Sequence, residues 1–121
     1  NCAQAVACSF CQEFGIDENE MFRIAEGFGL GMGVMEMCGA LSGMAMIIGL
    51  SNSQGNTEEG SKTKGDTYKK LRTYIQKFKE KNGSYICREL KGVETGKVLC
   101  SCPQCITDAV ALTEEYLAEN R

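Results

Sequence analysis

Eight cysteines and no histidine, in a chain of 121 residues, constrain this sequence more than any other feature. Short secreted chains with so many cysteines usually carry disulfide-linked, loop-rich folds. Here, long helical patterns and a hydrophobic content of 43% allow an ordinary apolar core instead. The composition therefore favours thiols kept for redox or metal chemistry in a cytoplasmic protein, with four disulfides in a secreted protein as the alternative.

The missing histidine excludes several functions. Without it there is no Ser–His or Cys–His catalytic pair, no imidazole metal site and no Cys-x-x-Cys-His attachment for haem. Any metal must therefore be held by sulfur, carboxylate or backbone groups. A net charge of −3 argues against a nucleic-acid partner. The glycines at residues 27–33 follow no strand and do not match the dinucleotide fingerprint, so no nucleotide cofactor is expected.

Hydrophobic periodicity predicts an all-α fold, a single-domain bundle of about five helices spanning residues 1–121. The expected helices cover residues 1–14, 18–26, 38–50, 66–82 and 103–119, with one further turn at 87–90. Residues 51–65 are polar and glycine-bearing, and are expected to form a mobile loop. The apolar run at 38–50 is shorter than the roughly 20 residues that span a bilayer. It is therefore expected to be a buried helix, and no membrane span is predicted.

Each expected helix has predicted boundaries and a predicted inward face. Asp17 and Asp66 are predicted N-caps, and Gly15 and Gly83 are predicted helix ends. The lysine-rich side of residues 66–82 is expected to face solvent, with docking of an acidic partner as the alternative. The predicted inward residues are Val6, Phe10, Phe14, Met21, Phe22, Ala25, Tyr68, Leu71, Ile75, Phe78, Cys105, Ala109, Leu112 and Tyr116.

Glycines recur at two places where the backbone is expected to approach another group closely. Residues 27–33 carry glycine at every second position. This favours a close-packed turn, or a loop whose N–H groups, including those of Gly31 and Gly33, line a cofactor pocket. Gly39 and Gly43 lie four residues apart on one helix face, where another helix or a cofactor can approach. That face would also suit a homodimer interface.

The cysteines near the end of the chain form a dense group. The motif Cys102-Pro103-Gln104-Cys105 places Cys102 at a predicted N-cap and Cys105 in the first helical turn, where the helix dipole favours thiolate. Cys100 makes this a cluster of three thiols, which suits metal binding or sulfur exchange. Cys38 is likewise expected at a helix N-terminus, and the glycines that follow it suggest a functional thiol.

Cys8 and Cys11 are three residues apart and share one face of the first expected helix. They are interpreted as small buried apolar residues. A tetrathiolate zinc site, shared with Cys102 and Cys105, is the alternative.

Four segments of the chain, in this order, resemble a family named for its pattern C_GCAxxG_C_C. They are Asn1-Cys2-Ala3-Gln4-Ala5-Val6, the Gly-Phe-Gly-x-Gly-Met-Gly run at 27–33, Cys38-Gly39-Ala40-Leu41-Ser42-Gly43, and Cys87-Arg88-Glu89-Leu90. The resemblance covers nearly the whole chain and implies a redox-active protein with four characteristic cysteines. Those four are Cys2, Cys38, Cys87 and Cys105 here, with Cys100 and Cys102 competing for the last place.

The resemblance implies two chemistries for these four cysteines: ligation of an iron–sulfur cluster, or reversible dithiol–disulfide exchange with an unknown redox partner. The four are the candidate catalytic residues, and Cys100 and Cys102 join them as candidate metal ligands. Two other functions stay open. One is a structural protein that binds zinc without catalysis, and the other is a helical protein-interaction module.

Overall fold

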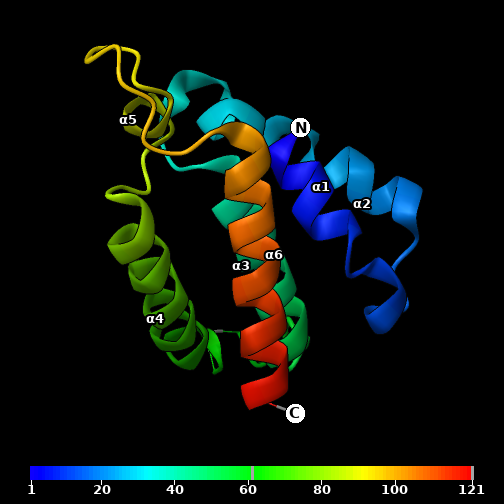
Figure 1. The fold of residues 1–121 in the computed structure, drawn as a ribbon. Helices are drawn as coiled ribbons and strands as arrows, with labels where there is room; N and C mark the ends of the chain where they lie inside the picture. The colour runs from blue at the N-terminus through cyan, green and yellow to red at the C-terminus, as the bar shows by residue number, and fades with distance from the viewer. Residues whose placement is uncertain (61, 121) are drawn as a thin grey trace.

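The structure, a computed structural model, describes residues 1–60 and 62–120. The described residues form helices joined by turns and loops and contain no strand, so the prediction of an all-α fold is confirmed. Short 3₁₀ turns follow the first two helices, and a wide π-helical turn covers Gly31–Met35. The helices are α1 (Cys2–Cys8), α2 (Glu18–Ala25), α3 (Gly39–Asn52), α4 (Lys64–Asn82), α5 (Cys87–Lys91) and α6 (Cys102–Glu119), as Figure 1 shows.

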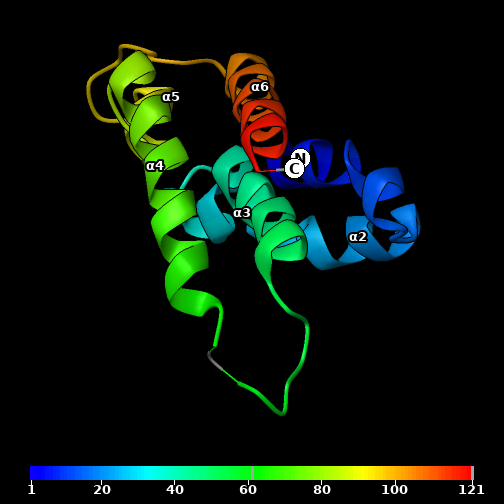
Figure 2. The ribbon, with the colours of Figure 1, turned by 90° about the horizontal axis from the view of Figure 1, so that it is seen from below.

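Helix α3 is the centre of the bundle. It packs against α1, α4 and α6, and seen from below it lies between α4 on one side and α1 and α2 on the other (Figure 2). Leu41, Met44, Ile47 and Ile48 of α3 are at most 1% exposed. A helix that is apolar on most of its surface is stable only when neighbours cover it, so the composition of residues 38–50 places this helix in the middle.

Helix α1 lies unusually close to α3 because two glycines of α3 face it. A Cβ atom added at Gly43 would stand 2.8 Å from the carbonyl oxygen of Ala3 and 2.9 Å from Cβ of Val6. At Gly39 the added atom would stand 2.9 Å from the carbonyl oxygen of Phe28. The sequence predicts that another helix or a cofactor approaches this glycine face, and in the structure it is helix α1 that packs there. The close packing places the N-terminus of α1 beside the N-terminus of α3.

Helices α4 and α6 are joined by a buried carboxylate. Asp108 on α6 is 5% exposed. It accepts hydrogen bonds from Lys81 Nζ at 2.6 Å, Gln104 Nε2 at 2.8 Å and Asn82 Nδ2 at 3.2 Å. Burial raises the pKa of this carboxyl, but the three donors outweigh burial and hold the pKa below its ordinary value.

Replacing Asp108 with alanine is expected to cost about 1–3 kcal/mol of unfolding free energy at pH 7, because the three hydrogen bonds to its charged, buried carboxylate are lost. Since the carboxyl has its lowered pKa only in the fold, its contribution is complete above pH 3.8 and is lost as the pH falls further. Urea unfolding of both proteins at pH 7 and pH 3 measures this. Asp66→Asn is the control and should change stability by less than about 0.5 kcal/mol, because its side chain is 59% exposed and its contacts with Lys70 and Asn52 lie at the surface. Equal stabilities of Asp108→Ala and the wild type at pH 7 would contradict the prediction.

Several boundaries and inward positions differ from the predictions. The expected helix at 1–14 breaks after Cys8 and resumes as a 3₁₀ turn at Cys11–Phe14. Helix α3 runs on to Asn52 and α4 begins at Lys64, which leaves residues 53–63 between them. The N-cap of α4 is Thr63, so Asp66 lies in the first turn and is not the cap.

Two aromatic residues predicted to lie inward are exposed. Phe22 is 50% exposed and Tyr68 is 55% exposed. On α2, Met21 and Ala25 alone supply the buried face of a two-turn helix. On α4, the missed residue Tyr74 is buried instead and stacks edge-on against Tyr116, with ring centroids 5.5 Å apart. The cap at Asp17 and the helix end at Gly83 are confirmed.

The lysine-rich face of α4 is partly engaged within the fold. Lys77 pairs with Glu115, and Lys79 lies over the ring of Tyr85. No helix in the described part of the chain combines the length and the apolar composition needed to cross a membrane.

Candidate functional site: a cavity lined by cysteines

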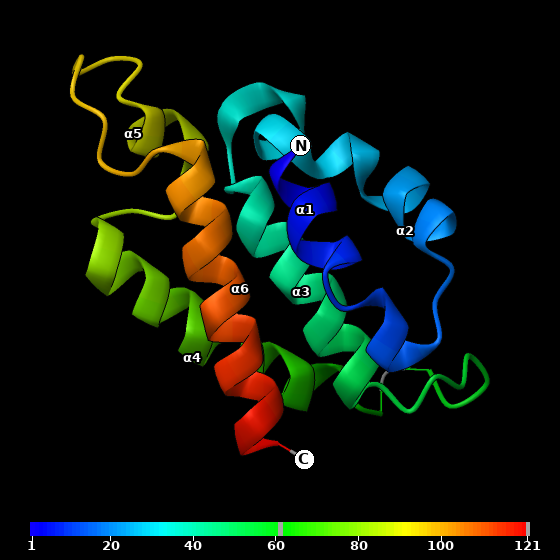
Figure 3. The same ribbon diagram turned by 45° about the vertical axis from the view of Figure 1, so that its right-hand side comes forward.

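A cavity of about 290 Å³ is lined by six of the eight cysteines. It lies where helix N-termini meet: Cys2 opens α1, Cys38 is the N-cap of α3, Cys87 opens α5, and Cys102 opens α6. Figure 3 shows the N-terminal ends of α1, α3 and α6 at one end of the bundle, next to α5. Cys100 and Cys105 complete the set, and Leu30 and Leu90 make part of the wall apolar.

A short backbone pairing brings Cys38 and Cys87 together. Met37 and Ile86 form an isolated antiparallel bridge. The N–H of Cys38 donates to the carbonyl of Tyr85 at 2.9 Å, and the N–H of Cys87 donates to the carbonyl of Glu36 at 2.5 Å. Two segments nearly fifty residues apart in the chain are thereby joined, and each starts a helix with a cysteine directly after the bridge.

The glycine-rich turn before Cys38 sets the direction of the chain into that bridge. Leu30, Met32 and Met35 have positive φ angles of 52°, 60° and 61°, which are unfavourable for residues with a Cβ atom. The N–H of Glu36 donates to the carbonyl of Gly31 at 3.2 Å and closes the wide turn. The turn also carries Leu30 to the wall of the cavity.

The deepest thiols of the cavity are those of Cys38, Cys100 and Cys105, which are 5%, 5% and 4% exposed. The Cys105 thiol has the thiols of Cys38 and Cys100 as neighbours, and both raise its pKa. Its Sγ also lies 3.8 Å from the carbonyl oxygen of Cys100. These three thiols therefore form the buried part of the cavity lining.

Cys38 and Cys105 differ strongly in acidity. The pKa of the Cys38 thiol falls from its ordinary value of 9.0 to about 7, chiefly because the Cys105 thiol donates a hydrogen bond to it. Burial opposes this shift, and the N–H groups of Ala40 and Leu41 in the first turn of α3 support it. The same contact raises the pKa of Cys105, and burial adds to that rise. Cys38 is thus the thiolate of the pair and Cys105 holds the proton.

Cys2 and Cys102 lie nearer the surface. Cys2 is half-buried and Cys102 is exposed, and their side chains are in hydrogen-bond contact. Burial, then the charges of Cys102 and Cys38, raise the pKa of Cys2 to about 11. Lys91 Nζ lies 3.9 Å from Cys102 Sγ. Cys87 is buried, and burial is the largest cause of its raised pKa.

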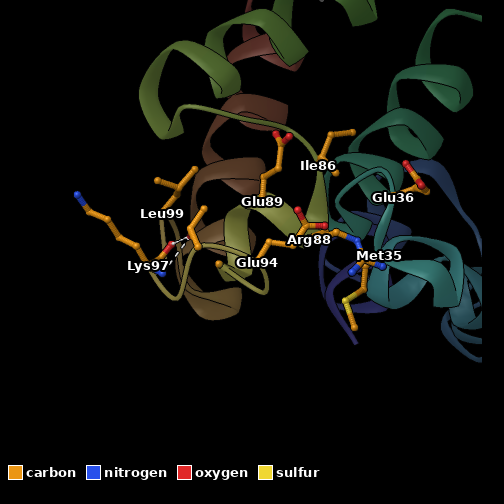
Figure 4. A pocket seen from close by; sticks show the side chains of 10 residues that line it. Met35, Glu36, Ile86, Arg88, Glu89, Glu94, Lys97 and Leu99 are labelled. Atoms are coloured by element: carbon orange, nitrogen blue, oxygen red, sulfur yellow. Dashed lines mark hydrogen bonds between the residues drawn. The ribbon is translucent and has the colours of Figure 1, made fainter.

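A larger cavity of about 620 Å³ lies across α5 from the thiols and has no cysteine in its lining. Its wall carries Glu36, Glu89 and Glu94 together with Arg88 and Lys97. Figure 4 shows Arg88 extended across this space toward Met35. Thiol chemistry therefore belongs to the smaller cavity, where the sulfur atoms are.

A family profile described as "Putative redox-active protein (C_GCAxxG_C_C)" matches residues 1–116. The chain belongs to this C_GCAxxG_C_C family. No curated protein and no solved structure matches the chain.

In this member of the C_GCAxxG_C_C family, the cavity lining includes the four candidate catalytic cysteines, Cys2, Cys38, Cys87 and Cys105, together with Cys100 and Cys102. All eight cysteines carry free thiols. Within residues 1–60 and 62–120, no three side chains of Cys, Asp or Glu are grouped in a way that would hold a metal ion. Ser101 is the N-cap of α6, so Cys102 is the first helical residue and not the predicted cap.

The four glycines predicted to bind a cofactor have different surroundings. Gly39 lines the cavity, whereas Gly43 lies against α1. Gly31 has a φ of +56° and lies against the backbone of Glu36, and Gly33 has a φ of +75° with open space around its Cα atom. Binding of a cofactor by these glycines stays a prediction.

Cys8 and Cys11 do not line the cavity. Their side chains contact each other, and Cys11 is buried in a small cluster with Ala3, Ala7 and Met21. This agrees with the interpretation of Cys11 as a buried apolar residue, whereas Cys8 is only half-buried, and neither lines the cavity with Cys102 and Cys105. The sequence offered no signal for this separation, because the break after Cys8 depends on tertiary packing.

Proposed function

We propose that this protein is a thiol-based redox protein in which Cys38 and Cys105 cycle between a dithiol and a disulfide. The observation that carries the proposal is the contact between the Cys38 sulfur and the Cys105 thiol, with the proton on Cys105. A disulfide needs two sulfur atoms that can meet, one of them as thiolate. Both conditions are met by side chains at the starts of α3 and α6, which the core holds in place.

The proposed reaction transfers two electrons to a disulfide substrate. The Cys38 thiolate attacks one sulfur of the substrate, forms a mixed disulfide and releases the other sulfur as a thiolate. Cys105 then gives its proton to that thiolate and attacks Cys38 Sγ. This second step forms the Cys38–Cys105 bond and releases the remaining substrate sulfur as a thiolate, which takes a proton from water. The substrate is reduced to two thiols, and the cysteine pair is oxidised.

Disulfide mapping tests this proposal. The reduced protein is incubated with glutathione disulfide, quenched in acid, digested and analysed. Because no Lys or Arg lies between residues 98 and 120, Cys105 shares a tryptic peptide with Cys100 and Cys102, and tandem fragmentation must separate them. A Cys38–Cys105 bond that forms first is expected. A mixture of pairs with no preference for Cys38, or a protein that keeps all its thiols, would overturn the proposal.

A second candidate function is binding of an iron–sulfur cluster or of zinc, and the observation that favours it is the presence of six thiols around one cavity. Cys2, Cys38, Cys87 and Cys105 are the proposed ligands, with Cys100 and Cys102 beside them. Elemental analysis and a visible spectrum of protein purified without oxygen test it. Iron with matching sulfide would support a cluster, and colourless protein with zinc and a chelator-sensitive melting temperature would support a structural metal. Protein that contains no metal would leave dithiol–disulfide exchange as the proposed function.

A further inference from the structure

Five of the six thiols of the cavity lie in two layers, an inner layer of Cys38, Cys100 and Cys105 and an outer layer of Cys2 and Cys102. The sixth, Cys87, is buried next to the backbone bridge that joins it to Cys38. Every inner thiol is at most 5% exposed, whereas Cys102 is exposed. A small disulfide can enter a cavity of about 290 Å³. A disulfide on the surface of another protein is held by its own backbone and does not fit there. If a protein exchanges electrons with Cys38, an outer thiol must carry them.

We propose that Cys102 and Cys2 form an entry dithiol that exchanges with a disulfide on a partner protein and passes the oxidation to Cys38 and Cys105. This inference rests on the proposed function and adds the partner class and the route. Cys102 is the sulfur that a partner reaches. Cys2 contacts Cys102 and lies close enough to Cys38 for the two charges to interact. Cys2 is therefore the thiol of the outer layer that would exchange with Cys38.

Two further groups at the cavity mouth suit a protein partner. Lys91 Nζ, 3.9 Å from Cys102 Sγ, places a positive charge beside the entry thiol. Leu30 lines the cavity and is 44% exposed, so it offers an apolar contact at the rim. The backbone and side chains around the partner's disulfide would contact both Lys91 and Leu30.

The relay runs through four exchange steps. Cys102 as thiolate attacks the partner disulfide, forms a mixed disulfide and releases one partner thiolate. Cys2 gives its proton to that thiolate and attacks Cys102 Sγ, which forms the Cys2–Cys102 disulfide and releases the second partner thiolate, which takes a proton from water. The Cys38 thiolate then attacks Cys2 Sγ and releases Cys102 as thiolate. Cys105 finally gives its proton to the Cys102 thiolate and attacks Cys38 Sγ. This step releases Cys2 as thiolate and leaves the oxidised inner pair with a reduced outer pair and a reduced partner.

The test compares two oxidants on the full chain. The protein oxidant is a domain of protein disulfide isomerase in its disulfide form, which is more oxidising than thioredoxin or the glutaredoxins, and the small oxidant is hydroxyethyl disulfide. The rate at which the Cys38–Cys105 bond forms is measured by acid quenching and mass spectrometry. Cys102→Ser is expected to slow oxidation by the protein at least ten times more than it slows oxidation by the small disulfide. Cys8→Ser, a half-buried thiol outside the cavity, is the matched control and should change neither rate.

A second variant identifies the intermediate. Cys2→Ser is expected to trap a mixed disulfide between Cys102 and the protein oxidant, visible on a non-reducing gel and absent from Cys2→Ser/Cys102→Ser. If Cys102→Ser is oxidised by the protein as fast as the wild type, or if no mixed disulfide accumulates, the relay is overturned while the inner pair stands. If neither oxidant produces a Cys38–Cys105 bond in the wild type, the proposed function fails and the relay fails with it.

Discussion

Replacing Cys38 with serine is expected to abolish formation of the inner disulfide and to slow reduction of hydroxyethyl disulfide at least a hundredfold, while the helical content is unchanged. The thiolate of the pair is lost, and serine is not a nucleophile at neutral pH. Cys105 keeps its proton and has no sulfur to attack. Because serine is close to cysteine in size and Cys38 lies at a helix N-cap, where serine is favoured, the fold should tolerate the change.

The pH dependence of the wild type should identify the same residue. With a pKa of about 7, roughly half of Cys38 is thiolate at neutral pH, against a few per cent of an ordinary cysteine. Alkylation of Cys38 by iodoacetamide, followed by mass spectrometry, should therefore rise through a midpoint near pH 7. It should fall by about tenfold per unit below that pH.

Cys11→Ser is the matched control for Cys38→Ser. Cys11 is also buried, but burial raises its pKa and it lies outside the cavity. This variant should keep the full rate of disulfide reduction and the same alkylation midpoint for Cys38. If Cys38→Ser retained wild-type activity, the role given to Cys38 would be wrong. If its activity fell together with its helical content, the loss would reflect misfolding, and alkylation of Cys38 in the wild type would decide the assignment.

The helices could be predicted because each depends on residues close in the chain. The Asp17 side chain caps α2 by accepting a hydrogen bond from the backbone N–H of Glu20, three residues further on. Gly15 and Gly83 end helices because they adopt positive φ angles of 65° and 86°. These interactions are local, so the sequence alone indicates them. Phe22 and Tyr68 show the limit of periodicity. A pattern places a residue on a face, but which part of that face is covered depends on neighbours from elsewhere in the chain.

The residues that form the site could be predicted from the sequence, but their arrangement in space could not. Cys38 at the start of α3 and Cys105 in the first turn of α6 follow from local helix signals. The resemblance to the C_GCAxxG_C_C family added Cys2 and Cys87, and the family profile supports that resemblance. Nothing local indicated that Met37 pairs with Ile86, which is what places Cys87 beside Cys38. The two layers of thiols depend on that pairing and on how closely α1 approaches α3.

The close approach of α1 to α3 also gives a prediction about stability. Gly43→Ala is expected to destabilise the protein by about 2 kcal/mol, because the new methyl group would meet the backbone oxygen of Ala3 at 2.8 Å and force α1 away from α3. Alanine is intrinsically better than glycine in a helix by about 1 kcal/mol, so the clash must outweigh that gain. Urea unfolding measures the difference.

Gly49→Ala in the same helix isolates the clash from the helix propensity. An added Cβ atom at Gly49 meets nothing within 4 Å, so this variant should be as stable as the wild type or up to about 1 kcal/mol more stable. If the two variants have equal stability, the close approach of α1 to α3 is wrong. If Gly43→Ala alone is destabilised, displacement of α1 should also move Cys2 from Cys102. Slower formation of the Cys2–Cys102 disulfide in Gly43→Ala than in Gly49→Ala would then show that the glycine face of α3 positions the outer thiols as well as the core.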